Sequence, residues 1–110
     1  MAFIDNIRQI SNAADKVKDN FLIAIRKSIE TVAKNGYHNT GFSPDNLCEM
    51  ATTAMGRGYY DSPLFETKAH PASVHETFEL FEYACNDLRN QGFKIEAHAS
   101  SNYIMFSITW

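Results

Sequence analysis

Residues 3–34 carry apolar side chains at alternating intervals of four and three positions. This spacing keeps the apolar side chains on one face and is typical of an amphipathic helix. The stripe consists of Phe3, Ile7, Ile10, Ala14, Val17, Phe21 and Ala24, and from Leu22 it widens to include Ile25, Ile29 and Val32. No proline or glycine interrupts it before Gly36, which is expected to end the helix. The pattern predicts one long helix, or two in near-continuous succession with Ser11 and Asn12 capping the second.

A single helix over residues 3–34 would be about 50 Å long, because each residue adds about 1.5 Å. That is more than a domain of this size needs, so two arrangements are open. The first turns could project from the body and expose an apolar stripe as a docking surface. Alternatively, the stripe could fold back onto the domain's own core.

Two further helices are indicated by their capping residues. Ser43 as N-cap, followed by Pro44 at the first helical position, predicts a helix over residues 44–55. Ser73, with Glu76 three residues later, forms a capping box that predicts a helix over residues 74–90. The apolar face of this third helix is expected to consist of Val74, Phe78, Phe81, Cys85 and Leu88. Between the two helices, glycines and prolines punctuate residues 56–72 and predict an irregular loop, of a length that is often functional.

Residues 93–110 alternate between apolar and polar side chains on either side of a polar turn at residues 100–102. This period of two predicts a hairpin whose second strand turns one face toward the helices. That face would consist of Ile104, Phe106, Ile108 and Trp110. Residues 37–42 are expected to form a short additional strand or a loop.

The fold class predicted from these elements is α+β, with three helices packed on a small antiparallel sheet formed mainly by the C-terminal hairpin. Residues 1–110 are expected to form a single domain, because the chain contains no linker or repeat. The alternative is a mostly helical bundle that carries the hairpin as an appendage.

The C-terminal third contains a helix ending in LRNQGFKI (residues 88–95), a polar turn, and the segment YIMFSITW (residues 103–110). An earlier long helix ends in VAKNG (residues 32–36). This combination resembles small, largely uncharacterised proteins of tailed bacteriophages over about half the chain, and it departs from them over residues 40–72, which look like an insertion. The resemblance implies a phage or prophage origin, and a role as a virion component or as an accessory factor that binds a host or phage protein.

Charge is distributed unevenly, although the formal net charge is only −3. Residues 1–35 carry six basic and four acidic side chains, while the remainder carries four basic and nine acidic ones. The basic residues of the first helix, with an Arg-aromatic cluster at Arg57, Tyr59 and Tyr60, make nucleic-acid binding an alternative function. Interleaved acidic residues and the negative total disfavour it.

Catalytic and metal-binding motifs are not apparent. The four histidines lack metal-ligand spacings, and Cys48 and Cys85 lie on apolar helical stripes where a thiol is usually inert. We therefore expect no enzyme activity, metal or cofactor, although a small enzyme remains a third class. No apolar run approaches the length needed to span a membrane, and no signal peptide is evident, so a cytoplasmic protein with reduced cysteines is expected, in a host cell or virion if phage-encoded.

The function favoured by the sequence is a non-enzymatic protein-interaction module, with a protein partner or self-association. Two surfaces are expected to carry it, because aromatic, aliphatic and arginine side chains dominate interface hot spots. The candidate residues are Phe3, Ile7 and Ile10 on the first helix, and Arg57, Tyr59, Tyr60, Leu64 and Phe65 in the loop.

Overall fold

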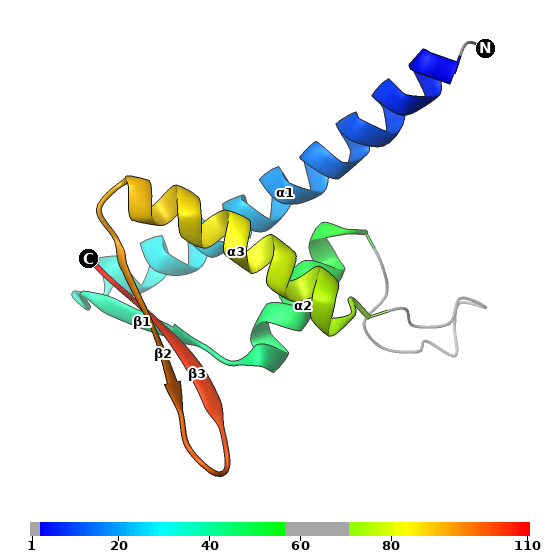
Figure 1. Cartoon of the computed structure of the whole chain (residues 1–110). Helices are drawn as coiled ribbons and strands as arrows, with labels where there is room; N and C mark the ends of the chain where they lie inside the picture. Colours follow the sequence, from blue (N-terminus) through cyan, green and yellow to red (C-terminus); the bar gives the residue numbers. More distant parts are fainter. Residues whose placement is uncertain (1–2, 57–70) are drawn as a thin grey trace, which may run out of the picture.

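The computed structural model describes residues 3–56 and 71–110 of the chain. Its elements follow in the order α1 (Phe3–Lys34), β1 (Asn39–Phe42), α2 (Pro44–Ala54), α3 (Val74–Asn90), β2 (Lys94–Ala99) and β3 (Ile104–Thr109). Three helices and a three-stranded antiparallel sheet confirm the predicted α+β class (Figure 1). Most of the loop predicted over residues 56–72 falls outside the described residues.

Helix α1 is one continuous helix, so Ser11 and Asn12 do not begin a second one. It ends as predicted, with Gly36 in a left-handed conformation at a φ of 87°. The amide of Gly36 donates to the carbonyl of Ala33 at 3.0 Å, which satisfies one of the last helical carbonyls. Only the second half of the helix is buried against the rest of the molecule, and the first half extends away from it (Figure 1).

Helices α2 and α3 both begin with the predicted caps. The hydroxyl of Ser43 accepts from the amide of Asn46 at 3.1 Å, and the amide of Ser43 donates to the Asn46 side chain at 3.2 Å. Ser73 and Glu76 form the same reciprocal pair, with both distances 3.1 Å. These bonds satisfy amides that would otherwise lack partners at the start of each helix.

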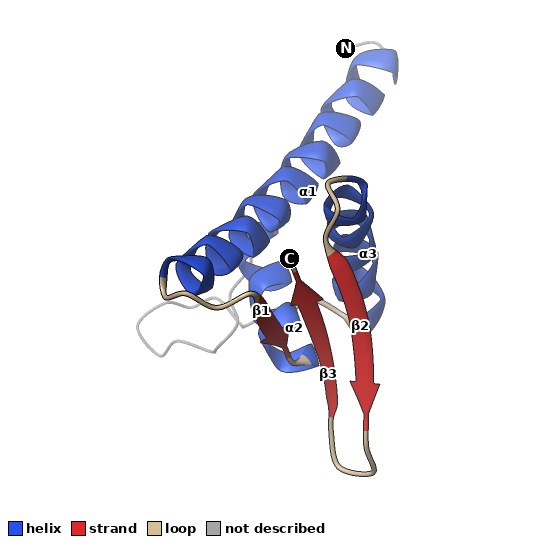
Figure 2. Cartoon of the chain, turned by 90° about the vertical axis from the view of Figure 1, so that its left-hand side faces the viewer, coloured by secondary structure: helices blue, strands red, loops and turns tan. Residues whose placement is uncertain are grey.

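The sheet has the order β1-β3-β2, so the strand, and not the loop, is the correct one of the two possibilities for residues 37–42, and β3 is central. Ile108 in β3 lies opposite Thr40 in β1 and Ile95 in β2. Helix α3 packs against this sheet (Figure 2), and the ring of Phe81 meets the ring of Phe106 edge-on with a centroid distance of 4.9 Å. Phe93 and Trp110 pack beside each other at 6.2 Å and close one side of the core.

One cluster of buried side chains joins the three helices to the sheet. Its largest fully buried members are Phe21 and Ile25 from α1, Leu47 from α2, Leu88 from α3 and Ile108 from β3. The second half of α1 therefore lies over both other helices, and its stripe supplies much of the core.

Three predicted core positions are wrong. Val74 is 75% exposed because it occupies the first turn of α3, outside the contact between that helix and the core. Phe78 is 36% exposed at the edge of this contact, where its ring meets the ring of Phe106 with a centroid distance of 5.8 Å. Thr77, Leu80 and Ala84 are buried instead, so the buried face of α3 is rotated from the one that hydrophobicity alone selected. Ile104 was expected to face the helices, but it is 47% exposed because the turn end of the hairpin extends past them (Figure 1).

Candidate functional site

The first half of α1, residues 3–16, contributes no residue to the buried core, and we call it the arm. Every one of these residues is exposed, including Phe3 at 78% and Ile10 at 66%. Phe21 and Ile25, on the same stripe further along the helix, are completely buried. The arm is therefore a continuation of a core-forming face beyond the core itself.

The spacing on the arm is that of a coiled-coil seam. Intervals of four and three residues place Phe3, Ile10 and Val17 at the d positions of a heptad, and Ile7 and Ala14 at its a positions. Ile4 widens the stripe on one side. In the body of the molecule this seam is covered by α2 and α3, but along the arm nothing in the described chain covers it.

Charged side chains avoid the apolar face of the arm. At 3.6 residues per turn, they lie about 80° or more around the helix from Ile7. They are Asp5, Arg8, Asp15 and Lys16. The positions that flank the seam carry Asn6, Ser11 and Ala13, which are uncharged. The arm therefore presents a wide apolar strip with neutral borders.

A groove of about 390 Å³ lies where the arm meets the body, and we call it the base groove. Its apolar wall combines Ala14 and Val17 from α1 with Met55 and Leu80 from the region of α2 and α3. Lys18, Glu76 and Glu79 contribute polar groups to its lining. Because Ala14 and Val17 belong to the seam, the groove continues the arm's apolar strip up to the body.

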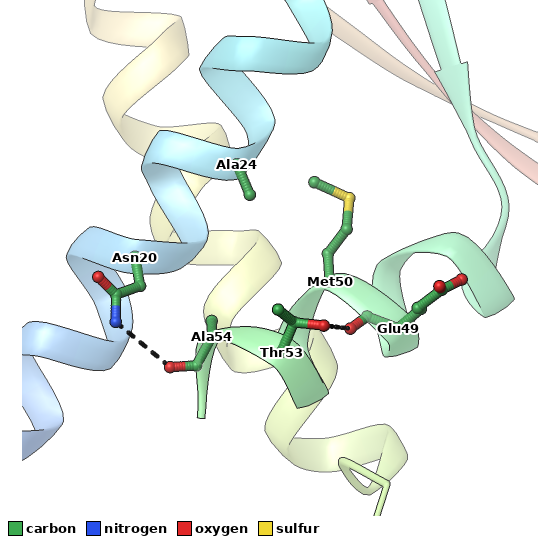
Figure 3. Close-up of a pocket in the computed structure, with 6 residues that line it drawn as sticks. All are labelled: Asn20, Ala24, Glu49, Met50, Thr53 and Ala54. Atoms are coloured by element: carbon green, nitrogen blue, oxygen red, sulfur yellow. Dashed lines mark hydrogen bonds between the residues drawn. The ribbon is translucent and has the colours of Figure 1, made fainter. Parts of the chain in front are cut away.

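Two other grooves offer no convergent chemistry. The groove in Figure 3 has a volume of about 380 Å³ and lies between α1 and α2. Its polar groups are used structurally, because the Asn20 amide donates to the carbonyl of Ala54 at 3.4 Å, and the Thr53 hydroxyl donates to the carbonyl of Glu49 at 3.0 Å. Another groove, of about 500 Å³, has Trp110 and Phe93 in its wall and places Arg26 and Glu30 on α1 beside it.

The two cysteines are free, with Cys85 buried and Cys48 half-buried. Burial raises the pKa of the Cys85 thiol to about 11, so the reactive thiolate is suppressed at neutral pH. The Cys48 thiol donates to the carbonyl of Ala72 at 3.3 Å, which ties α2 to the residue before the cap of α3. Both thiols act as packing groups.

Within residues 3–56 and 71–110, no three histidine, cysteine or acidic side chains cluster in a way that could hold a metal ion. His75 and His98 each lie beside a single glutamate, Glu79 at 3.0 Å and Glu96 at 3.7 Å. Both pairs are exposed on the surface. In the same described ranges, no helix is both long enough and apolar enough to span a membrane.

The basic side chains of α1 do not form a continuous positive face. Arg26 is paired with Asp87 at 2.9 Å, and the Lys18 ammonium lies 5.5 Å from the centre of the Tyr83 ring. Three further lysines lie on the same side of the helix as three acidic residues. The lysines are Lys16, Lys27 and Lys34, and the acidic residues are Asp5, Asp19 and Glu30.

The structure brings Phe3, Ile7 and Ile10 together on the exposed arm. The other predicted interaction residues lie outside the described residues: Arg57, Tyr59, Tyr60, Leu64 and Phe65. The base groove was missed by the sequence interpretation. Met55 and Leu80 are distant from Val17 in the chain, and no local pattern indicates that they meet.

Comparisons with known protein families, with curated proteins and with solved structures found no match for this chain.

Proposed function

We propose that this protein is a non-enzymatic interaction module that binds a protein partner through the apolar face of its arm. The observation that carries the proposal is the exposure of Phe3, Ile7 and Ile10 on a seam whose other half forms the core. Contiguous apolar surface of this kind is a common mark of a protein-binding site.

The stability of the arm also favours a partner. Most helical stability in proteins comes from packing an amphipathic face against other elements. The arm has no such packing within the described chain, and it contains Asn6, Ser11 and Asn12, which are poor helix formers. A partner that covers the apolar strip supplies the missing stabilisation.

A partner that offers a matching helical groove suits this surface best. Apolar anchors at intervals of three and four residues are the recognition pattern of an amphipathic helix docked in a groove. The resemblance to small phage proteins suggests the setting, a virion or the cytoplasm of an infected host cell. Nucleic acid is not favoured, because acidic side chains interrupt the lysines on the outer side of α1.

Site-specific photo-cross-linking tests the proposal. A photoreactive phenylalanine analogue replaces Ile7 on the apolar face, and in a matched control it replaces Asn12 on the opposite side of the same helix. We expect protein adducts, identified by mass spectrometry, from position 7 and few from position 12. Equal or absent labelling from the two positions, in purified protein and in the cells that produce it, contradicts the proposal.

A further inference from the structure

We infer that the partner of the arm is a second copy of this chain, with the two arms paired antiparallel and each Phe3 seated in the base groove of the other copy. This inference rests on the proposed function and specifies the partner. It is carried by the charge pattern, the side-chain sizes and the position of the base groove.

The charge pattern allows the arm to bind itself. In a symmetric dimer the same patch is present on both sides, so a patch with a surplus of one charge sign repels its own copy. The arm has no charged residue on its strip, and its borders carry Asn6, Ser11 and Ala13. Nothing on this face repels a second copy, and no surplus charge selects a partner of opposite sign.

The side-chain sizes match in one antiparallel register. When a positions face d positions of the other helix, Ile7 lies opposite Ile10, and Phe3 lies opposite Ala14. The largest side chain of the strip thus meets its smallest, and the two isoleucine layers fill the centre. Alternation of large and small residues across facing positions is how helices interdigitate without voids.

The base groove lies where this register places the partner's Phe3. Ala14 forms part of its wall, together with Val17, Met55 and Leu80. A ring packed over Ala14 therefore reaches the apolar wall of this groove of about 390 Å³ and extends the buried surface from the arm onto the body. Seating Phe3 in the base groove therefore fixes the register of the two arms.

The antiparallel direction of the pair follows from the position of α2 and α3 on α1. Beyond Val17 the seam is occupied by the chain's own α2 and α3. A parallel pair would bring both bodies to the same end, where they compete for one space, whereas an antiparallel pair places them at opposite ends. The opposed helix dipoles also attract each other.

The interface is small, so a reversible dimer is expected. The arm is about 20 Å long at 1.5 Å per residue, and four core layers bury less than the roughly 800 Å² per partner of a standard interface. The base groove adds to this area. We expect dissociation in the micromolar range, which sedimentation velocity over a dilution series of the full chain will reveal.

Two substitutions that each introduce an aspartate separate the apolar strip from the opposite side of the helix. Ile7→Asp places a charge in the seam and is expected to weaken the dimer at least tenfold, whereas Asn12→Asp on the opposite side is expected to change it less than threefold. Both lie outside the core, so the thermal unfolding of the body should be unchanged and serves as the folding control. Equal effects of the two substitutions overturn the inference.

A size-swap tests the register. Phe3→Ala and Ala14→Phe should each weaken the dimer several-fold, and the double variant should recover most of the loss, because it exchanges the members of one layer. A parallel pair stacks each position on its own copy, so the double variant would then be at least as weak as either single one. That result overturns the antiparallel arrangement.

Charged residues introduced at the borders of the apolar strip test independently whether the two arms pair antiparallel or parallel. In the antiparallel pair position 6 lies beside position 13 of the other arm, so Asn6→Glu with Ala13→Lys should strengthen the dimer and Asn6→Glu with Ala13→Glu should weaken it. In a parallel pair position 13 lies beside Lys18 of the other copy, so the ranking reverses. The reversed ranking overturns the inference.

The remaining outcomes separate this inference from the proposed function. A monomer at all concentrations, combined with adducts between position 7 and a different protein, overturns self-pairing and leaves the proposed function intact. A monomer that instead co-sediments with vesicles of phosphatidylcholine and phosphatidylglycerol, and no longer does so after Ile7→Asp, indicates membrane binding. That result overturns both self-pairing and the proposed function. Adducts from position 7 to a second copy, with the concentration-dependent dimer, support both.

Discussion

The two halves of α1 have the same apolar spacing but different surroundings. In the second half, Phe21 and Ile25 are completely buried beneath α2 and α3, while in the arm Phe3 and Ile10 are mostly exposed. A helical stripe therefore indicates which face will be buried, and it does not indicate by what. Where the chain's own elements end, the same face becomes available to another molecule.

Amide hydrogen exchange should give the largest contrast between the halves. Amides of residues 21–32 are expected to exchange only when the whole domain unfolds, at a free energy of about 5–15 kcal/mol. Those of the arm should exchange at least about a thousandfold faster in dilute protein, because their opening disrupts no buried contact. Mass spectrometry of peptides from each half measures this. Equal protection at high dilution would show that the arm is covered within its own chain.

The same experiment at higher concentration sharpens the comparison. If two arms pair, protection of residues 3–16 should rise with protein concentration while that of residues 21–32 stays constant. The Ile7→Asp variant provides the control, since it should lose the concentration dependence.

Truncation of an isoleucine in each half should affect the free energy of unfolding very differently. Ile25→Ala removes a fully buried side chain and is expected to cost about 2–5 kcal/mol, because it leaves a cavity. Ile10→Ala in the arm should cost less than about 1 kcal/mol in dilute solution, because it leaves none. Urea denaturation followed by circular dichroism measures both, and a cost above 2 kcal/mol for Ile10→Ala would contradict the exposed arm.

Helices α2 and α3 cover the second half of α1, and a buried hydrogen bond attaches the start of α3 to α2. The buried Thr52 hydroxyl accepts from the amide of Ala72 at 2.8 Å and donates to the carbonyl of Cys48 at 2.7 Å. Thr52→Val leaves the Ala72 amide without its partner and is expected to cost about 1–3 kcal/mol. Thr53→Val is the control, because the Thr53 hydroxyl is exposed and donates to the carbonyl of Glu49 within its own helix, and it should change stability by less than half as much.

The smallest effect is expected from the ion pair between the second half of α1 and α3. Arg26 and Asp87 are 2.9 Å apart, but both side chains are partly in solvent. Arg26→Ala should cost about 0.2–1 kcal/mol, with less effect at high salt. Arg8→Ala in the arm, where the described chain provides no ion pair, should be neutral in the same denaturation experiment. A larger loss for Arg8→Ala would indicate a contact across a dimer.

Local signals accounted for the element boundaries. The capping box at Ser73 and Glu76, the Ser43 cap and the left-handed Gly36 each depend on bonds between residues a few positions apart, so they are legible in the chain itself. The period of two placed the hairpin, and the spacing of four and three placed α1. These features are determined by backbone hydrogen bonding and by the side on which each residue points.

Tertiary structure decided which apolar residues are covered. Val74 is as apolar as Leu80, yet Val74 is exposed while Leu80 is buried, and a buried position between them belongs to Thr77. The base groove brings Met55 and Leu80 to Val17, and the arm is exposed because α2 and α3 reach only part of α1. Burial is a property of contacts between distant segments, which a linear pattern does not contain.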